Sequence, residues 1–217
     1  MGTYATKNIR NVALVGHSGC GKTSLSEAMF FDTGAATRLG RVEDGTTISD
    51  WDDEEKRRHV SINTSLIPCE WKGTKINVLD TPGYADFAGD VVAAVAVADA
   101  GLVMVDAVAG AEVGTELTWS YLVERNLPRL IVVNKMDREN ANFEKALQSL
   151  REHFAGTIVA LQVPIGKEHD FRGVVDLMQM KAFVGSKGDV QDIPANLKAE
   201  VEKARTQLIE AAAEGND

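Results

Sequence analysis

Residues 16–23 read GHSGCGKT, a glycine-rich stretch between an apolar strand-like run and a helix-like run. The stretch matches the pattern G-x-x-x-x-G-K-[ST] in full. Glycines allow the backbone to turn so that successive N–H groups point inward, and the start of the following helix adds its positive end. We therefore expect a phosphate-binding loop made of Gly16, His17, Ser18, Gly19, Cys20, Gly21, Lys22, Thr23 and Ser24.

Two side chains of this loop have chemical roles that its backbone cannot fill. Lys22 is expected to reach the β- and γ-phosphates of a nucleotide, and the hydroxyl of Thr23 is expected to ligate Mg²⁺. A glycine-rich turn without a ligand is the alternative. The loop alone does not distinguish ATP from GTP.

The chain around the loop alternates between short apolar runs and helix-period stretches. The apolar runs predict strands over 11–16, 74–80, 101–107 and 129–135, and the intervening patterns predict helices over 22–30, 86–98, 113–125 and 141–154. The run SINTSLIPCEW (61–71), followed by Lys72 and Gly73, predicts an antiparallel partner joined by a tight turn. The predicted fold is α/β: a mixed, mostly parallel sheet with helices on both faces.

Polar residues follow two further predicted strands, where the functional groups of such a sheet gather. Asp80 can serve the metal, and the N–H of Gly83 can meet a γ-phosphate. Asp137 can accept two hydrogen bonds from the guanine N1–H and N2–H₂, a donor pair that adenine lacks. Lys135 can lie across the purine, and the amide of Asn134 can tie this loop to the phosphate loop. Each motif alone is a common turn, but all three in this order predict a guanine-nucleotide site.

Composition excludes several classes of protein. A chain of 217 residues with 44% hydrophobic and 25% charged residues is typical of a globular protein. The formal net charge of −9 argues against generic binding to nucleic acids or anionic membranes. The longest apolar run, 91–98, is too short to span a bilayer. Cys20 and Cys69 make no metal-binding spacing, so we expect free thiols and a cytoplasmic location.

The motifs and their surroundings resemble the translational GTPases, and within them the G domain of elongation factor G. The resemblance rests on DWDDEEKRRHVSI (50–62, the switch I region), DAVAGAEVGTELTW (106–119), NKMDRENANFEKAL (134–147) and LQVPIGKEHDFRGVVDLMQMKAF (161–183). It implies a P-loop NTPase fold, GTP/GDP and Mg²⁺ as cofactors, GTP hydrolysis, and the ribosome as partner of a monomeric protein.

The resemblance also implies a division of the chain. Residues 1–157 correspond to the G domain without its last strand and helix, and residues 158–217 to part of the inserted G′ subdomain. The pattern of Leu197, Val201, Ala204 and Leu208 predicts a terminal amphipathic helix over 192–212.

Three departures from the family pattern indicate an elongation factor G-like paralogue. Gly19 stands where the family usually has Asp, Arg58-His59-Val60-Ser61 where it has Arg-Gly-Ile-Thr, and Tyr84 where it has His. Ser61 keeps a hydroxyl that can ligate Mg²⁺. The charged run 52–58 predicts a solvated loop face, with a partner surface as the alternative. His59 is expected to be a solvated loop histidine, with a gate residue as the alternative.

The tyrosine bears on catalysis, which we assign to Lys22, Gly83 and Tyr84. Because Tyr84 lacks an imidazole to orient the attacking water, we expect slow hydrolysis in isolation. The alternative is that Tyr84 packs against switch I and turnover is intact. Two other functions stay open at this point: a GTP-held interaction switch with little hydrolysis, and an ATP-using phosphotransferase.

Overall fold

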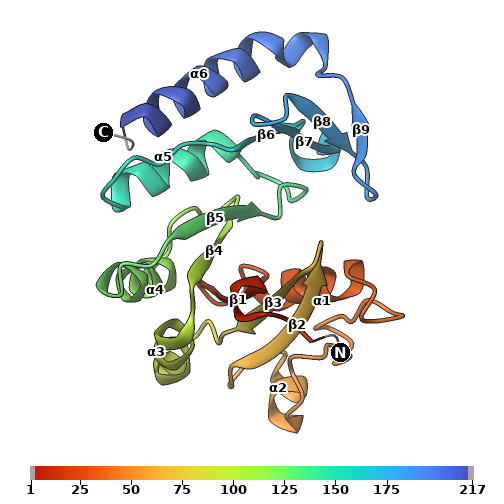
Figure 1. Cartoon of the computed structure of the whole chain (residues 1–217), viewed down its shortest axis with the longest axis vertical. Coiled ribbons are helices and arrows are strands. Elements are labelled where there is room, and N and C mark those ends of the chain that lie inside the picture. Colours follow the sequence, from red (N-terminus) through yellow and green to blue (C-terminus); the bar gives the residue numbers. More distant parts are fainter. Residues whose placement is uncertain (1–2, 215–217) are drawn as a thin grey trace. The chain divides into compact units, whose positions relative to one another are not determined.

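The computed structural model describes residues 3–214, which form two compact units (Figure 1). The first unit runs to Asp106 and resumes over Ala111–Asn134. The second consists of Ala107–Gly110 and the chain from Lys135 onward. Compactness thus groups helix α5 (Phe143–His153) with the second unit, whereas the sequence-based boundary at residue 157 groups it with the first. That boundary stays a prediction.

A five-stranded sheet organises the first unit. Its strands are β1 (Ile9–Gly16), β2 (Ser65–Trp71), β3 (Thr74–Asp80), β4 (Ala100–Asp106) and β5 (Arg129–Asn134). They lie in the order β2-β3-β1-β4-β5, and every neighbouring pair is parallel except β2 with β3. The predicted mixed, mostly parallel sheet is confirmed.

The antiparallel pair is closed by the expected two-residue turn. Trp71 pairs with Thr74, and Lys72 and Gly73 between them have φ values of 46° and 78°. Two consecutive left-handed residues are the signature of the turn type whose twist matches that of the flanking strands. The turn fixes the register of β2 against β3.

Helices cover both faces of this sheet. On one face Leu14, Ile67, Val78 and Met104 form a buried cluster with Leu25, Met29 and Phe30 of α1 (Lys22–Asp32). Residues alternate between the two faces of a strand. The opposite face therefore includes Gly101, against which Leu122 of α4 (Val113–Glu124) packs, and α3 (Ala88–Val97) lies beside α4. Two short 3₁₀ turns, η1 (Thr6–Asn8) and η2 (Ala85–Phe87), complete the unit.

The charged run of switch I is more than the solvated loop that the sequence predicted. It forms a short helix, α2 (Asp53–Arg58), with Asp52 and Glu55 in a capping box. The side chain of Glu55 is fully buried, and its carboxylate accepts the N–H groups of Ile62 (2.9 Å) and Asn63 (3.0 Å). Only the opposite side of the helix, with Arg57 and Arg58, is solvated.

An antiparallel meander and two helices build the second unit. Its strands are β6 (Gln162–Ile165), β7 (Gly173–Asp176), β8 (Lys181–Val184) and β9 (Asp189–Gln191). The short 3₁₀ turn η3 (Glu168–Asp170) lies between β6 and β7, and η4 (Ala195–Leu197) lies between β9 and the last helix. Val201 of α6 (Lys198–Glu214) is buried with Val163, Ile165 and Val175. The terminal helix starts later than predicted because Pro194 lies in extended backbone and η4 follows it.

No helix within residues 3–214 combines the length and the apolar character that crossing a bilayer requires.

Gly101 and Leu122 should be energetically coupled. A Cβ at position 101 would lie 2.5 Å from Leu122 Cδ1. Gly101→Ala is expected to cost about 1–3 kcal/mol by overpacking, and Leu122→Ala about 2–5 kcal/mol by leaving a cavity. The double variant should cost less than the sum, because the new methyl group occupies part of that cavity. Urea unfolding followed by tryptophan fluorescence reports the first unit, which contains Trp51, Trp71 and Trp119. Additive costs would contradict this packing.

Candidate functional site

The glycine-rich loop between β1 and α1 needs glycine at defined positions. Gly16, Gly19 and Gly21 have φ values of 140°, 75° and 98°, a region that side chains disfavour. A Cβ on Gly16 would lie 2.4 Å from the carbonyl oxygen of Met104. Helix α1 begins at Lys22, directly after Gly21. The loop therefore ends on a helix N-terminus, where free N–H groups favour an anion.

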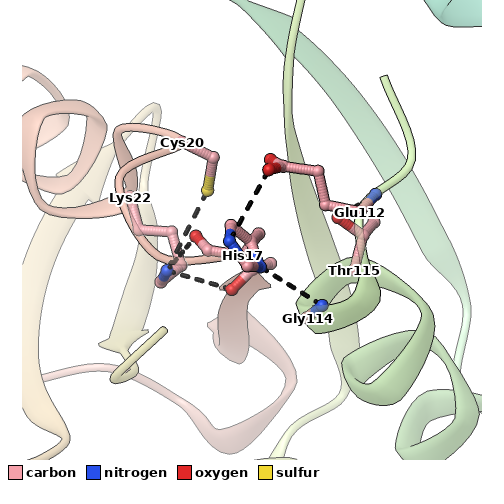
Figure 2. Close-up of polar contacts among 7 residues, drawn as sticks. His17, Cys20, Lys22, Glu112, Gly114 and Thr115 are labelled. Atoms are coloured by element: carbon pink, nitrogen blue, oxygen red, sulfur yellow. Dashed lines mark hydrogen bonds and ion pairs between the residues drawn. The ribbon is translucent and has the colours of Figure 1, made fainter. Parts of the chain in front are cut away.

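The ammonium group of Lys22 is held inside this loop. The residue is only 6% exposed, and Nζ donates to the carbonyl oxygens of Gly16 (3.1 Å) and His17 (2.9 Å). The Sγ of Cys20 lies 3.9 Å away, on the same side of the loop (Figure 2). These hydrogen bonds position the ammonium group at the glycine-rich loop, where its charge can meet a phosphate.

His17 connects the loop to the start of α4, as Figure 2 shows. Its Nδ1 accepts the N–H of Gly114 at 3.2 Å, and its Nε2 lies 3.6 Å from Glu112 Oε1. An accepting Nδ1 carries no proton, so the neutral ring has its proton on Nε2, facing the carboxylate. A Cβ on Gly114 would lie 2.6 Å from Nδ1, which explains a glycine inside a helix.

A hydroxyl pair joins the phosphate loop to switch I. Thr23 Oγ1 and Ser61 Oγ are 3.1 Å apart, and Ser61 Oγ donates to Asp50 Oδ1 at 2.7 Å. Burial raises the pKa of the Asp50 carboxyl, while the hydrogen bonds from Ser61 and Thr47 oppose the rise. Asp50 was not among the predicted site residues.

Asp80 ends strand β3 with a buried carboxyl group. Ser26 Oγ donates to Oδ2 at 3.1 Å, whereas Oδ1 is buried and has no hydrogen-bond partner among residues 3–214. Burial raises the pKa of Asp80 to about 6, and the Lys22 ammonium and the hydroxyls of Thr23 and Ser26 limit the rise. An acceptor left unsatisfied in the interior is costly, so this oxygen is suited to a bound cation or its water.

These residues fit a magnesium ion. The described residues contain no group of three or more His, Cys, Asp or Glu side chains that could hold a metal by themselves. Mg²⁺ in nucleotide sites instead takes hydroxyls, waters and substrate phosphates. The paired hydroxyls of Thr23 and Ser61, with the orphaned oxygen of Asp80 in the same unit, supply that donor set.

Gly83 brings its segment against the phosphate loop. A Cβ there would lie 2.6 Å from both Lys22 Nζ and Ser18 Cα, so only glycine allows the approach. The next residue, Tyr84, is 46% exposed and lines a small hollow together with Leu117 and Tyr121 of α4. The structure thus places Tyr84 beside the site with an accessible ring.

Asn134, at the end of β5, makes the expected tie to the phosphate loop: its Nδ2 donates to the carbonyl oxygen of Cys20 at 2.9 Å. The structure therefore brings together, in one unit, the loop residues, Ser61, Asp80, Gly83 and Asn134. Of the other loop residues, Ser24 is exposed on the first turn of α1. His59 is an exposed residue at the end of α2.

The remaining predicted residues, Lys135 and Asp137, belong to the second unit. Lys135 has a left-handed backbone (φ 60°) and Met136 is buried, while Asp137 is exposed. The carboxylate of Asp137 is thus accessible to a ligand.

Sequence reasoning missed Asp50, Glu112 and Gly114. Asp50 and Glu112 look like ordinary surface acids in the sequence. Gly114 did carry a signal, since a glycine inside a helical pattern usually has a packing reason.

Comparison with known proteins agrees with this geometry. The model of the family "Elongation factor Tu GTP binding domain" matches residues 7–216. Elongation factor G of Wolbachia pipientis subsp. Culex pipiens (strain wPip) is 37% identical over 214 residues, which cover 96% of this chain and 31% of that protein. The crystal structure of ttk003000868 from Thermus thermophilus matches with a TM-score of 0.92 at 37% identity, over 96% of this chain and 32% of the other.

The chain therefore spans about a third of the length of these relatives. The expected resemblance to elongation factor G and the expected P-loop α/β fold are both confirmed. The match over nearly the whole chain, on a structure with the phosphate loop intact, shows that this chain belongs to the family of elongation factor Tu GTP-binding domains.

Proposed function

We propose that this chain is the GTP-binding and GTP-hydrolysing domain of an elongation factor G-like translation factor that acts on the ribosome. The observation that supports this proposal most strongly is the phosphate loop itself, with a buried Lys22 ammonium, a helix N-terminus, and the Thr23–Ser61 hydroxyl pair. The relative named elongation factor G supports the ribosome as partner and the cytoplasm as location.

In this proposal the phosphates lie at the N-terminus of α1. Lys22 binds the β- and γ-phosphates, and the N–H of Gly83 binds the γ-phosphate. Thr23, Ser61 and Asp80 would hold Mg²⁺, which would supply positive charge to the phosphate oxygens.

Guanine recognition falls to Asp137, whose exposed carboxylate accepts from N1–H and N2–H₂. Lys135 covers the purine face, and Asn134 links the base and phosphate loops. Adenine lacks this pair of donors, so the role of Asp137 argues against an ATP-using phosphotransferase.

Hydrolysis in isolation is slow in this proposal. Tyr84 provides a phenol, which is a poor proton acceptor at neutral pH. A positioned acid or base contributes typically about 10²–10⁴ in rate. The second candidate function, a GTP-held interaction switch with little hydrolysis, rests on the same substitution of Tyr84 for the family's His.

The base assignment predicts a clear nucleotide preference. Hydrogen bonds to a charged group contribute about 1.5–3 kcal/mol each, so GTP should bind well over tenfold more tightly than ATP. Asp137→Asn should shift the preference toward xanthine nucleotides, because an amide donor pairs with the C2 oxo group. Titration calorimetry measures both effects, with the exposed neighbour variant Glu139→Gln as control. Equal affinity of the unmodified chain for ATP and GTP would refute the assignment.

The phosphate loop predicts two separable defects. Lys22→Ala should weaken GDP binding at least tenfold, because it removes a buried charge that meets phosphate directly. Thr23→Ala should instead lower the dependence of affinity on Mg²⁺, measured as the change in GDP dissociation constant on adding EDTA. Lys7→Ala, at an exposed lysine outside the loop, should leave both quantities unchanged. Normal affinity and metal response in both loop variants would mean that the loop is only a turn.

The role of Tyr84 predicts a gain of rate. Tyr84→His should speed single-turnover GTP hydrolysis by about 10²–10⁴ in the presence of ribosomes, since an imidazole can orient the attacking water. Tyr84→Phe keeps the ring without the hydroxyl and should be no faster than the unmodified protein. A histidine variant that gains nothing, with or without ribosomes, would show that Tyr84 does not limit turnover.

A further inference from the structure

The loop that carries Asp137 is fastened on both sides by one residue, Glu168. The N–H of Glu168 donates to the carbonyl oxygen of Met136 at 2.8 Å. Its Oε1 accepts the N–H of Asn140 at 3.0 Å. All four residues belong to the second unit. Main chain and side chain of one residue thus bind the loop immediately before Asp137 and three residues after it.

Glu168 is itself held by a tight connection between β6 and β7. Gly166 has a φ of 80°, and a Cβ there would lie 2.1 Å from the carbonyl oxygen of Asp170. The N–H of Arg172 donates to the carbonyl oxygen of Ile165 at 3.1 Å, which closes the connection. Ile165 is 1% exposed, in the core of the meander. The two hydrogen bonds between Glu168 and the loop, which we call the clamp, are therefore anchored in a packed sheet.

Left-handed backbone conformations occur both in the loop that carries Asp137 and in the β6–β7 connection. Lys135, Asn140 and Glu168 are non-glycine residues with φ values of 60°, 65° and 54°. Such conformations persist only when the surroundings over-determine them, and they concentrate at functional sites. Lys135 begins the loop that carries Asp137, and Asn140 is the residue in that loop whose N–H binds Glu168.

We propose that Glu168 is a positioning residue for guanine recognition, which fixes the loop so that the Asp137 carboxylate meets both donors of the base. The inference rests on the proposed role of Asp137. Its physical basis is pre-organisation: a carboxylate must face two N–H groups at once, so a small displacement of the loop loses one of the two hydrogen bonds. The meander thereby sets nucleotide specificity without touching the nucleotide.

The test compares GDP with inosine 5′-diphosphate, which keeps N1–H but lacks the N2 amino group. Glu168→Ala removes the acceptor for Asn140 while leaving the main-chain N–H in place. It should weaken GDP binding about tenfold and bring the GDP and inosine diphosphate affinities closer together. Glu168→Gln keeps a neutral oxygen and should restore most of the difference. Glu210→Ala, at an exposed glutamate of α6, is the matched control and should change neither affinity.

A double-mutant cycle separates positioning from general damage to the unit. In an Asp137→Ala background, Glu168→Ala should have no further effect on GDP affinity, because the carboxylate that it positions is gone. Equal losses for both nucleotides, or the same loss in both backgrounds, would overturn the proposal. If Asp137→Ala abolishes guanine preference and Glu168→Ala does not reduce it, only the clamp is refuted. If the unmodified chain binds ADP as tightly as GDP, the proposed function fails together with the clamp.

Discussion

The burial of one ammonium group, that of Lys22, constrains the rest of the glycine-rich loop and its surroundings. A buried charge is tolerable only when it is hydrogen-bonded, and the partners here are the carbonyl oxygens of Gly16 and His17. Those carbonyls must turn inward, which requires a loop without a Cβ at Gly16 and a firm hold on the loop from outside. The contact of the His17 imidazole with α4 and the amide of Asn134 on β5 provide that hold.

Much of this could be predicted from the sequence, because the informative residues are close together along the chain. The strand ends at Gly16, Asp80 and Asn134 follow from apolar runs, and the parallel sheet brings them to one edge. The Lys72–Gly73 turn follows from local turn preferences. These features depend on periodicity and on backbone geometry, which a single sequence records directly.

The features that could not be predicted depend on contacts that no secondary-structure period records, some of them between distant residues. Glu55 sits in a charged run, and its burial follows only from the chain returning at Ile62 and Asn63 to donate its N–H groups. Asp50 becomes buried for a similar reason, through Ser61. The contact between His17 and Gly114 joins residues 97 positions apart. Nothing in the local sequence marks such pairs, since polarity alone says that these acids should be solvated.

The antiparallel pairing of β2 with β3 has a consequence for the two segments that carry Ser61 and Gly83. Ser65 pairs with Asp80 at one end of this ladder, so the segment that leads from Ser61 into β2 and the segment that begins at Thr81 adjoin the same residue pair. A register shift of one residue would turn every side chain of β2 to the opposite face of the sheet. The register of β2 against β3 is therefore fixed. The two segments therefore diverge from a single residue pair, whose place in the sheet is fixed by the register of the ladder.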